Sequence, residues 1–423
     1  MYKIIKIGSL QLIHSSFDNF ETASLGVFLK TGARFEKKSQ KGIAHFLEHM
    51  VFKGSASYSY KKIKREIEGR GGILNGFTSQ EMTAYYAHFL KKNTLITLDI
   101  LLDMVLNPSL LSYEINKERD VVLEEIKMYN DLPGSCAATI LDNLLWEKHP
   151  LGKDIIGTEE SVNGITKKDL VNFKNNFYIP SNVVISFCGD FSIDKIKKFI
   201  EKKIKNKIKS KRKRIQQKKP DKLKGVKIKI TKKDTQQSHL HLGFRSIPYK
   251  DDKKIVQELL HVILGANMSS RLFESLREKR SLCYAVSASV KKFKDSGAFI
   301  IKVGLDKENI GLALSVIKKE LNKIKNKPIA KSELTRAKDY FLGQLSMSLE
   351  QSQGRMFYFA QSYIKSANIK SLDKIKEQVK AIEPYQIRDF SKKLFDFRNL
   401  SLSAVGNLDN ELAAKIKEII SSL

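Results

Sequence analysis

Apolar residues alternate, or recur at helical spacing, in clearly separated stretches of the first half of the chain. The strand-like stretches, rich in apolar and β-branched residues, are 2–7, 25–34, 73–78, 82–89 and 182–189. The stretch over 25–34 is predicted to be a buried strand that runs into a turn. Helical spacing is found over 42–53, 59–68, 95–105, 113–129, 166–177 and from residue 193 onward. Strands and helices therefore follow one another along the chain, which predicts a mixed α+β fold.

The second half of the chain repeats parts of this pattern. Residues 399–406 form a strand-like stretch with Asn and Gly seven apart, as residues 182–189 do, and a helix follows each of them. A strand over 239–245 precedes a helix over 256–264, just as a strand precedes the helix at 42–53. We infer an internal duplication. The predicted fold class is α+β, with two homologous α/β-sandwich domains.

A strongly basic stretch separates the two halves. Lysine and arginine dominate from Lys202 to Lys224, where only Asp221 is acidic. Such a run is typical of a solvated helix end followed by a linker. The predicted parts are an N-terminal domain, a basic linker and a C-terminal domain, over 1–208, 209–225 and 226–423.

The net charge raises the question of a polyanionic partner. The chain of 423 residues has a formal net charge of +30, which alone would suggest nucleic acid or an anionic membrane. Most of the 76 basic residues are lysines spread along the chain, and they are not gathered with aromatic residues into a binding module. We therefore expect neither nucleic acid nor a membrane as a partner.

The cysteines and the N-terminal residues bear on the compartment. Cys136, Cys188 and Cys283 are far apart and form no Cys-x-x-Cys pair, which argues against a disulfide framework or a thiolate zinc site. The first residues carry no apolar signal core, and no run approaches the ~18 apolar residues of a membrane span. We expect a cytoplasmic protein.

The most informative stretch is His45-Phe46-Leu47-Glu48-His49. In a helix, His45 and His49 lie four residues apart and Glu48 three from His45, so the three side chains can project from one face. Two imidazoles on adjacent turns can bind zinc and leave a carboxylate free to take a proton from water. The His-x-x-Glu-His order is the inverzincin signature. The alternative is an amphipathic helix that carries two histidines by chance.

A third ligand is expected on the helix over 113–129. Glu118 and Glu125 are seven residues apart and share one face, with Glu114 one turn earlier, whereas Glu124 is rotated by about 100°. A carboxylate on that face would complete a His2Glu site, and a second one would support it from outside. From spacing alone Glu118 and Glu125 are nearly equal candidates, and a solvated acidic helix face is the alternative.

The second half has no matching metal motif. Its helix over 256–264 carries a single histidine, His261, for which we expect a structural role. His239 and His241 alternate on the preceding strand without a nearby carboxylate motif, and we expect them to be structural as well.

Together these features resemble the M16 metallopeptidases, which include the mitochondrial processing peptidase, its bacterial relatives and, more distantly, insulin-degrading enzyme. The resemblance covers essentially the whole chain and is carried by 42–53, 118–126 and 269–284. It implies that Glu125 is the third ligand and that Glu118 is a supporting acidic residue. It also implies that Arg277 and Tyr284 reach from the second half toward the substrate. Asn75 lies in a segment that matches the family's edge strand, and its amide is expected to bind substrate backbone.

The function implied by the resemblance is a zinc-dependent endopeptidase acting on unfolded peptides or small polypeptides. One Zn²⁺ per chain would be held by three protein ligands: His45, His49 and Glu125. Glu48 would accept a proton from water and pass it to the leaving amine. Arg277, a permanent cation, and Tyr284, a phenolic donor, would hold substrate carbonyls or the developing oxyanion. Ordinary roles in a solvated helix end and a strand are the alternatives for these two residues, and a turn is the alternative for Asn75.

Family members of this length pair two chains. Because this chain has an intact metal motif together with Arg277 and Tyr284, a homodimer is expected, and a heterodimer with a non-catalytic M16-like subunit is the alternative. The alternative function is a non-catalytic member that binds peptides or a partner subunit. Such members have typically lost motif residues, whereas none is lost here.

Overall fold

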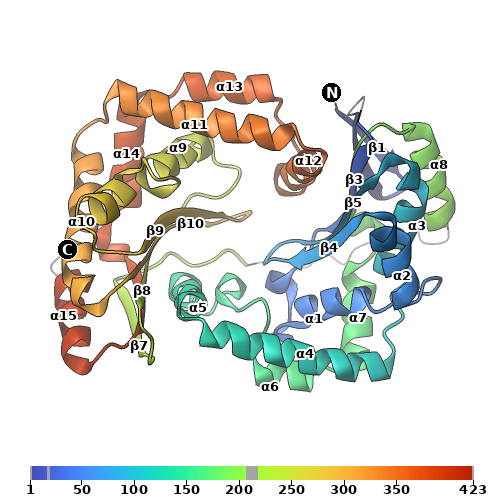
Figure 1. Cartoon of the computed structure of the whole chain (residues 1–423), viewed down its shortest axis with the longest axis horizontal. Helices are drawn as coiled ribbons and strands as arrows, with labels where there is room; N and C mark the ends of the chain where they lie inside the picture. The colour runs from blue at the N-terminus through green and yellow to red at the C-terminus, as the bar shows by residue number, and fades with distance from the viewer. Residues whose placement is uncertain (1, 17–19, 206–217, 422–423) are drawn as a thin grey trace. The chain divides into compact units, whose positions relative to one another are not determined.

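The computed structural model of the chain describes residues 2–16, 20–205 and 218–421 (Figure 1). The chain divides into two compact units. Unit 1 comprises residues 1–127, 153–217 and 347–369, and unit 2 comprises residues 128–152, 218–346 and 370–423. Each unit thus takes in a segment from the other half of the sequence, a feature absent from the predicted division into contiguous domains.

Unit 1 is built on a mixed sheet with the strand order β1-β2-β6-β3-β5-β4. Its strands are β1 (Tyr2–Ile7), β2 (Leu10–Ser15), β3 (Thr22–Leu29), β4 (Ile73–Thr78), β5 (Thr83–Leu90) and β6 (Val183–Cys188). Strands β2 and β6 are parallel, and the other neighbours are antiparallel. Strand β4 ends the strand order, so its outer edge is a position where an additional strand can pair.

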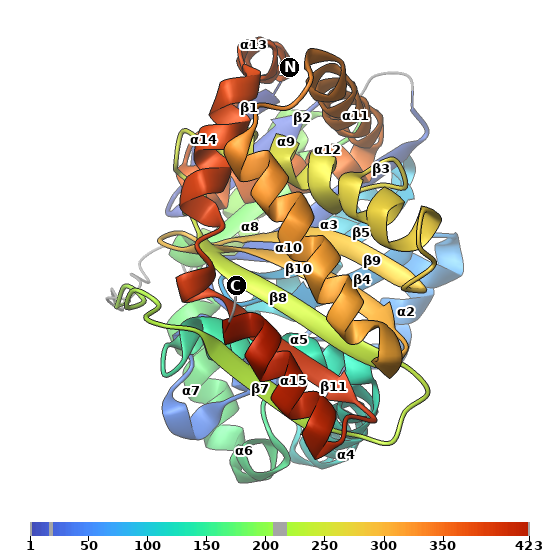
Figure 2. The same ribbon diagram turned by 90° about the vertical axis from the view of Figure 1, so that its left-hand side faces the viewer.

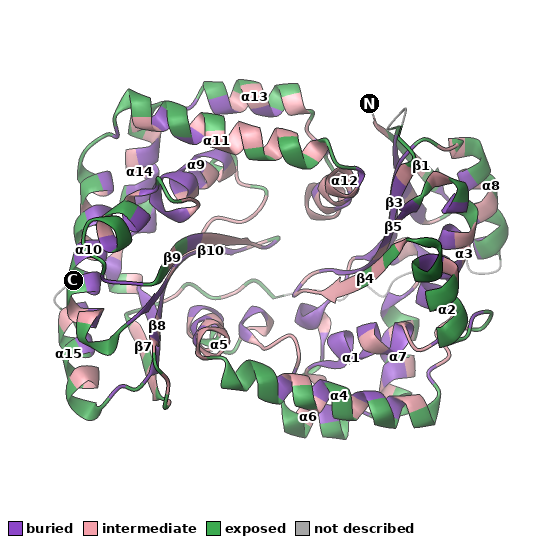
Figure 3. Cartoon of the chain, viewed as in Figure 1, coloured by how far each residue is buried: buried purple, intermediate pink, exposed green. Residues whose placement is uncertain are grey.

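Both faces of this sheet are covered. On one face Val27 and Leu29 of β3 pack into the core of a helical layer. The helices of that layer are α1 (Ile43–Val51), α2 (Tyr60–Ile67), α3 (Thr94–Leu106), α4 (Ser112–Asp131), α7 (Lys167–Phe177) and α8 (Ile193–Ile204). On the other face Phe28 packs against Met356 and Ala360 of α12 (Ser352–Ser366). Because β3 is buried on both faces (Figure 3), its sequence is an almost continuous apolar run.

Unit 2 has a sheet with the strand order β7-β11-β8-β10-β9. Its strands are β7 (Lys227–Lys232), β8 (Ser238–Ser246), β9 (Ala285–Lys292), β10 (Gly297–Leu305) and β11 (Ser401–Gly406). On one face lies α5 (Pro133–Trp146), where the Ser403 hydroxyl donates a hydrogen bond of 2.7 Å to the Ala137 carbonyl. Figure 2 shows α10 (Ile310–Asn326) and α15 (Asn410–Ser421) in front of the sheet, on its other face.

The topology confirms the duplication inferred from the sequence. In both units the last strand of the half lies between two consecutive earlier strands, parallel to one and antiparallel to the other. In unit 1 β6 lies between β2 and β3, and in unit 2 β11 lies between β7 and β8. The hairpin β5-β4 of unit 1 has its counterpart in β10-β9 of unit 2. The predicted two-domain α+β fold is therefore confirmed.

The stretch over 25–34, predicted to be a strand that runs into a turn, is a strand up to Leu29 and then turns into a short 3-10 helix, Ala33–Phe35. Of the predicted basic linker, residues 209–217 lie outside the described residues, and residues 218–225 have no regular helix or strand. Within the described ranges of the chain, no helix is long and apolar enough to cross a membrane.

Candidate metal centre

Helix α1 carries the His-x-x-Glu-His motif and is buried on nearly all sides. Phe46, Leu47 and Met50 have no exposed surface and are fixed in the apolar core of unit 1. His45 and Glu48 are each 8% exposed. The apolar side chains therefore hold the helix in place, and the motif side chains project from its remaining face.

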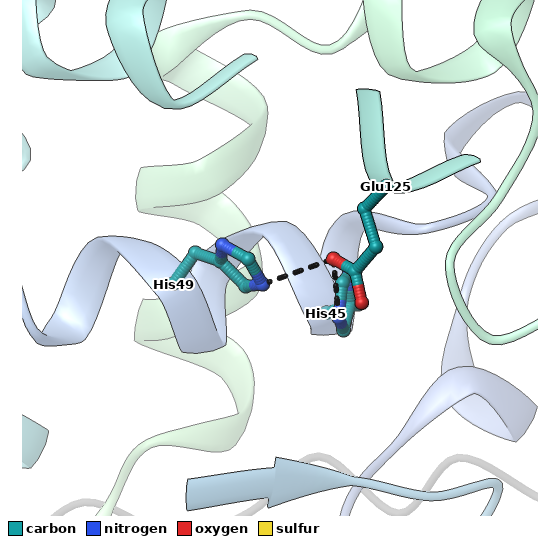
Figure 4. A group of neighbouring side chains, drawn as sticks. All are labelled: His45, His49 and Glu125. Atoms are coloured by element: carbon teal, nitrogen blue, oxygen red, sulfur yellow. Dashed lines mark ion pairs between the residues drawn. The ribbon is translucent and has the colours of Figure 1, made fainter. Parts of the chain in front are cut away.

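Three donor atoms converge beside this face. The Nε2 atoms of His45 and His49 lie 3.6 Å and 3.5 Å from Oε2 of Glu125, which belongs to α4 (Figure 4). The donor atoms of the three residues all lie within 4.8 Å of one another. Tetrahedral zinc with bonds of about 2.0–2.1 Å separates its ligand atoms by roughly 3.3 Å, so this donor set fits a zinc ion. Among the described residues, no other group of three histidine, cysteine or acidic side chains is placed to hold a metal.

The charges around the rings favour a cation. Burial, assisted by His49, lowers the pKa of His45 to about 4, so this imidazole is neutral and can donate its lone pair. Burial alone would also lower the pKa of His49, but hydrogen bonds and charges of Glu118 and Glu125 outweigh it and raise that pKa to about 9. An environment that stabilises a proton between two carboxylates also stabilises a metal cation there.

The structure distinguishes Glu118 from Glu125, which were nearly equal candidates for the third ligand on spacing alone. Glu125 faces the Nε2 atoms, whereas Oε1 of Glu118 lies 2.9 Å from Nδ1 of His49, on the far side of the ring. Glu118 is 5% exposed, and its Oε2 lies 2.5 Å from Nζ of Lys53. Glu124 points into solvent, with a side chain 72% exposed. Of the predicted carboxylate stripe, Glu118 is buried and Glu125 is half-buried, so the solvated-face alternative is wrong for Glu118.

Glu48 is the residue of the motif that does not belong to the donor set. Burial raises the pKa of Glu48, while a hydrogen bond from the Thr78 side chain and the charge of His49 oppose that rise. Its Oε2 is buried and has no hydrogen-bond partner among the described residues. A buried acceptor without a partner, on the same helix as two ligands, is suited to receive a proton from water or substrate.

Comparison with known proteins identifies the family. Residues 13–159 match the model described as insulinase, peptidase family M16, and residues 164–341 match the one described as peptidase M16 inactive domain. An uncharacterized zinc protease of Bacillus subtilis is 33% identical over 92% of this chain and 94% of its own length. The chain belongs to the M16 peptidase family.

One further curated relative and two solved structures are also similar to this chain. An uncharacterized zinc protease of Rickettsia felis is 30% identical over 91% of this chain and 92% of its own. A protease from Helicobacter pylori has the same fold, with a TM-score of 0.89 at 21% identity, covering 96% of this chain and 99% of that one. A putative M16-like peptidase from Alicyclobacillus acidocaldarius gives a TM-score of 0.82 at 22% identity, with 96% and 98% covered.

The remaining site residues predicted for an M16 peptidase lie in both units. Asn75 is on the edge strand β4 of unit 1, and its Oδ1 accepts a hydrogen bond of 2.7 Å from the Gly76 amide. In unit 2, Arg277 lies in a π-helical turn, Phe273–Glu278, with its guanidinium 5.9 Å from the ring centre of Tyr284. Tyr284 is 72% exposed and directly precedes β9. The structure thus brings Arg277 and Tyr284 together, and the roles of all three toward substrate stay predictions.

The histidines of the second M16 half have structural surroundings. Nε2 of His261 lies 2.9 Å from the Ala288 carbonyl oxygen. His241 is 4% exposed, and burial, together with nearby cations, lowers its pKa to about 3. His239 packs beside Gly134, and burial lowers its pKa as well. Burial and a backbone contact of this kind are typical of structural histidines, the role expected for these three residues.

Sequence reasoning missed two residues of the centre. Lys53 follows His49 by four residues, so helical spacing gave a signal for its position near Glu118. Thr78, which contacts Glu48, lies on β4, and only the pairing of β4 with β5 beside α1 brings it there. No local pattern in the sequence marks that contact.

Proposed function

We propose that this M16 protein is a zinc-dependent endopeptidase that hydrolyses peptide bonds in unfolded peptides or small polypeptides. The proposal rests on one observation. Three donor atoms suited to zinc lie beside a buried carboxylate, Glu48, that shares their helix and has a free oxygen. A purely structural metal site needs no such carboxylate, because its ligands fill all positions of the ion.

Each residue then has a definite role. His45, His49 and Glu125 hold one zinc ion per chain, and Glu118 orients His49 through Nδ1. Bound zinc supplies a Lewis acid that polarises a peptide carbonyl and lowers the pKa of water toward 7. Glu48 takes a proton from the attacking water on its free oxygen and later gives it to the leaving amine.

The edge strand β4 supports the choice of unfolded peptides as substrate. An extended peptide can add to this edge through backbone hydrogen bonds, which do not depend on the side chains of the peptide. Asn75 lies on that strand and can add an amide contact to the peptide backbone. We assign Arg277 and Tyr284 to substrate carbonyls or the developing oxyanion, because the pair offers a permanent cation and a phenolic donor.

The proposed assembly is a homodimer, with a heterodimer containing a non-catalytic M16-like chain as the alternative. It rests on the presence in one chain of the metal motif and of the Arg277 and Tyr284 pair. Peptides are the proposed ligands, and nucleic acid and membranes are not among the proposed partners. The expected cytoplasmic location stays a prediction.

The test compares wild type with Glu48→Gln and with Glu124→Gln as a matched control on an exposed glutamate. Zinc content is measured by mass spectrometry, and cleavage is followed on a library of quenched, unstructured peptides. We expect about one zinc per chain in all three proteins, and a loss of cleavage of about 10²-fold or more in Glu48→Gln only. Stoichiometric zinc without wild-type cleavage would favour the non-catalytic alternative, and absence of zinc would refute the ligand assignment.

A further inference from the structure

A second buried glutamate, Glu36, contacts the start of the motif helix. Its side chain is 7% exposed, and both carboxylate oxygens are engaged. Oε2 accepts a hydrogen bond from the Gly42 amide and Oε1 accepts one from the Ala44 amide, each of 3.0 Å. Ala44 directly precedes His45, so the carboxylate holds the backbone one residue before the first metal ligand.

This contact replaces an ordinary helix cap. Helix α1 begins after Gly42, which has φ +87° and offers no side chain to accept from the first turn. A Cβ at Gly42 would lie 2.5 Å from the Ile156 carbonyl oxygen, so no larger residue fits there without a shift. The first N–H groups of a helix need acceptors. Glu36, six residues before Gly42, provides them for the Gly42 and Ala44 amides.

Glu36 is itself held by the segment that carries it. The Ala33 and Arg34 amides donate to the carbonyl oxygens of Ser79 and Gln80, over 3.1 Å and 2.8 Å. The fully buried Arg34 side chain lies 2.5 Å from Glu81. These three contacts tie the segment to the turn between β4 and β5, so the Glu36 carboxylate approaches α1 from a fixed position.

The electrostatic setting shows what this placement requires. Burial raises the pKa of Glu36 to about 8, while the amides of Ala44 and Gly42 and the half-buried Lys153 act in the opposite direction. The positive end of the helix dipole adds to that effect. Burying a carboxylate is unfavourable in free energy, so a buried carboxylate is expected where its position serves the site.

We propose that Glu36 is a positioning residue for the metal centre, whose carboxylate fixes the first turn of α1 and thereby the ring of His45. The inference rests on the proposed function, since it takes His45 as a zinc ligand. It concerns zinc affinity and not the proton transfer assigned to Glu48. Removing the cap lets the first turn fray, and the donor atoms then meet the ion in the required geometry only part of the time.

The experiment measures the zinc dissociation constant of the full chain by competition with a chromogenic chelator, together with thermal unfolding of the metal-free protein. Glu36→Gln is the test variant and Asp103→Asn the matched control. Asp103 is also 7% exposed and accepts from the Ser57 amide over 2.8 Å, but it makes no contact with the first turn of α1. We expect both variants to lose thermal stability. Zinc binding should weaken by about 10–100-fold in Glu36→Gln and by less than about twofold in Asp103→Asn.

Equal zinc affinities in Glu36→Gln and Asp103→Asn would overturn the proposal. If Glu36→Gln does not fold, Glu36→Asp is the second test variant, because it keeps the carboxylate but is one methylene too short to reach both the Gly42 and the Ala44 amides. Weaker zinc binding by Glu36→Asp supports the proposal, and wild-type affinity overturns it. Wild-type protein that binds zinc but cleaves no peptide refutes only the peptidase. Wild-type protein that binds no zinc refutes both.

Discussion

Replacement of Glu118 by glutamine tests how much the metal centre depends on a residue that is not a ligand. In the structure Glu118 accepts from Nδ1 of His49 and also contacts Lys53. This contact keeps a proton of the His49 ring on Nδ1, so Nε2, the atom that faces Glu125, is the one left to bind a metal. Glu118→Gln keeps the shape of the side chain and removes its charge.

The expected magnitude follows from these contacts. Glutamine can still accept one hydrogen bond from His49, so the ring keeps its orientation in part. The loss of the charge makes the ring a weaker donor, and outer residues of this kind contribute about 10–100-fold to metal affinity. That range corresponds to about 1.4–2.7 kcal/mol of binding free energy. The folded protein should lose about 1–2 kcal/mol, because Lys53 is 25% exposed and can regain water.

The assay is zinc competition at neutral pH on wild type, Glu118→Gln and two controls. Glu124→Gln removes an exposed charge of the same helix, whose pair with Lys127 at 2.8 Å is a surface ion pair of small effect. Lys53→Met leaves the bond between Glu118 and His49 intact, and we expect it to change zinc affinity by less than about threefold. If Glu118→Gln binds zinc within twofold of Glu124→Gln, the role given to Glu118 is refuted.

Two further predictions concern stability. Gly42→Ala should destabilise the protein by more than about 1 kcal/mol. Gly42 has φ +87°, and an added Cβ would lie 2.5 Å from the Ile156 carbonyl oxygen. The measurement is denaturant unfolding, and an unchanged midpoint would contradict the prediction. Burial lowers the pKa of His241 from 6.5 to about 3, so the unfolded state binds the additional proton. The contribution of His241 is therefore present above pH 6.5 and lost as the pH falls toward 3, by up to about 1.4 kcal/mol per pH unit. His241→Leu should show a flatter decline of unfolding free energy between pH 6.5 and 4.5, and an identical slope would show that His241 is not the group responsible.

The sequence predicted the elements of the site better than their contacts. Local spacing places His45, Glu48 and His49 on one face of a helix, and the structure has them there. Glu118 and Glu125 share a helix face, and only the way α4 crosses α1 brings Glu125 to Nε2 and Glu118 to Nδ1. That crossing depends on packing between elements more than sixty residues apart, which no local pattern encodes.

The same reason explains what was missing from the predicted fold. An apolar helix face looks alike whichever sheet it covers, so the pattern cannot tell that α12 packs on the sheet of unit 1 or that α5 packs on the sheet of unit 2. The apolar run of β3 predicted a buried strand, and such a run is typical of a strand covered on both faces. It required a covering layer on the side of Phe28 without identifying the helix that provides it.

Three buried glutamates of unit 1 lie on or near α1, although protein cores are mostly apolar. Glu36, Glu48 and Glu118 are each less than 9% exposed, and all three belong to α1 or contact it or its ligand His49. Burying a carboxylate is unfavourable unless hydrogen bonds or cations compensate. Glu36 and Glu118 have such partners in the protein, whereas one oxygen of Glu48 has none among the described residues. The carboxylates with both oxygens engaged are therefore the ones we assign to positioning, and the one with a free oxygen is the one we assign to chemistry.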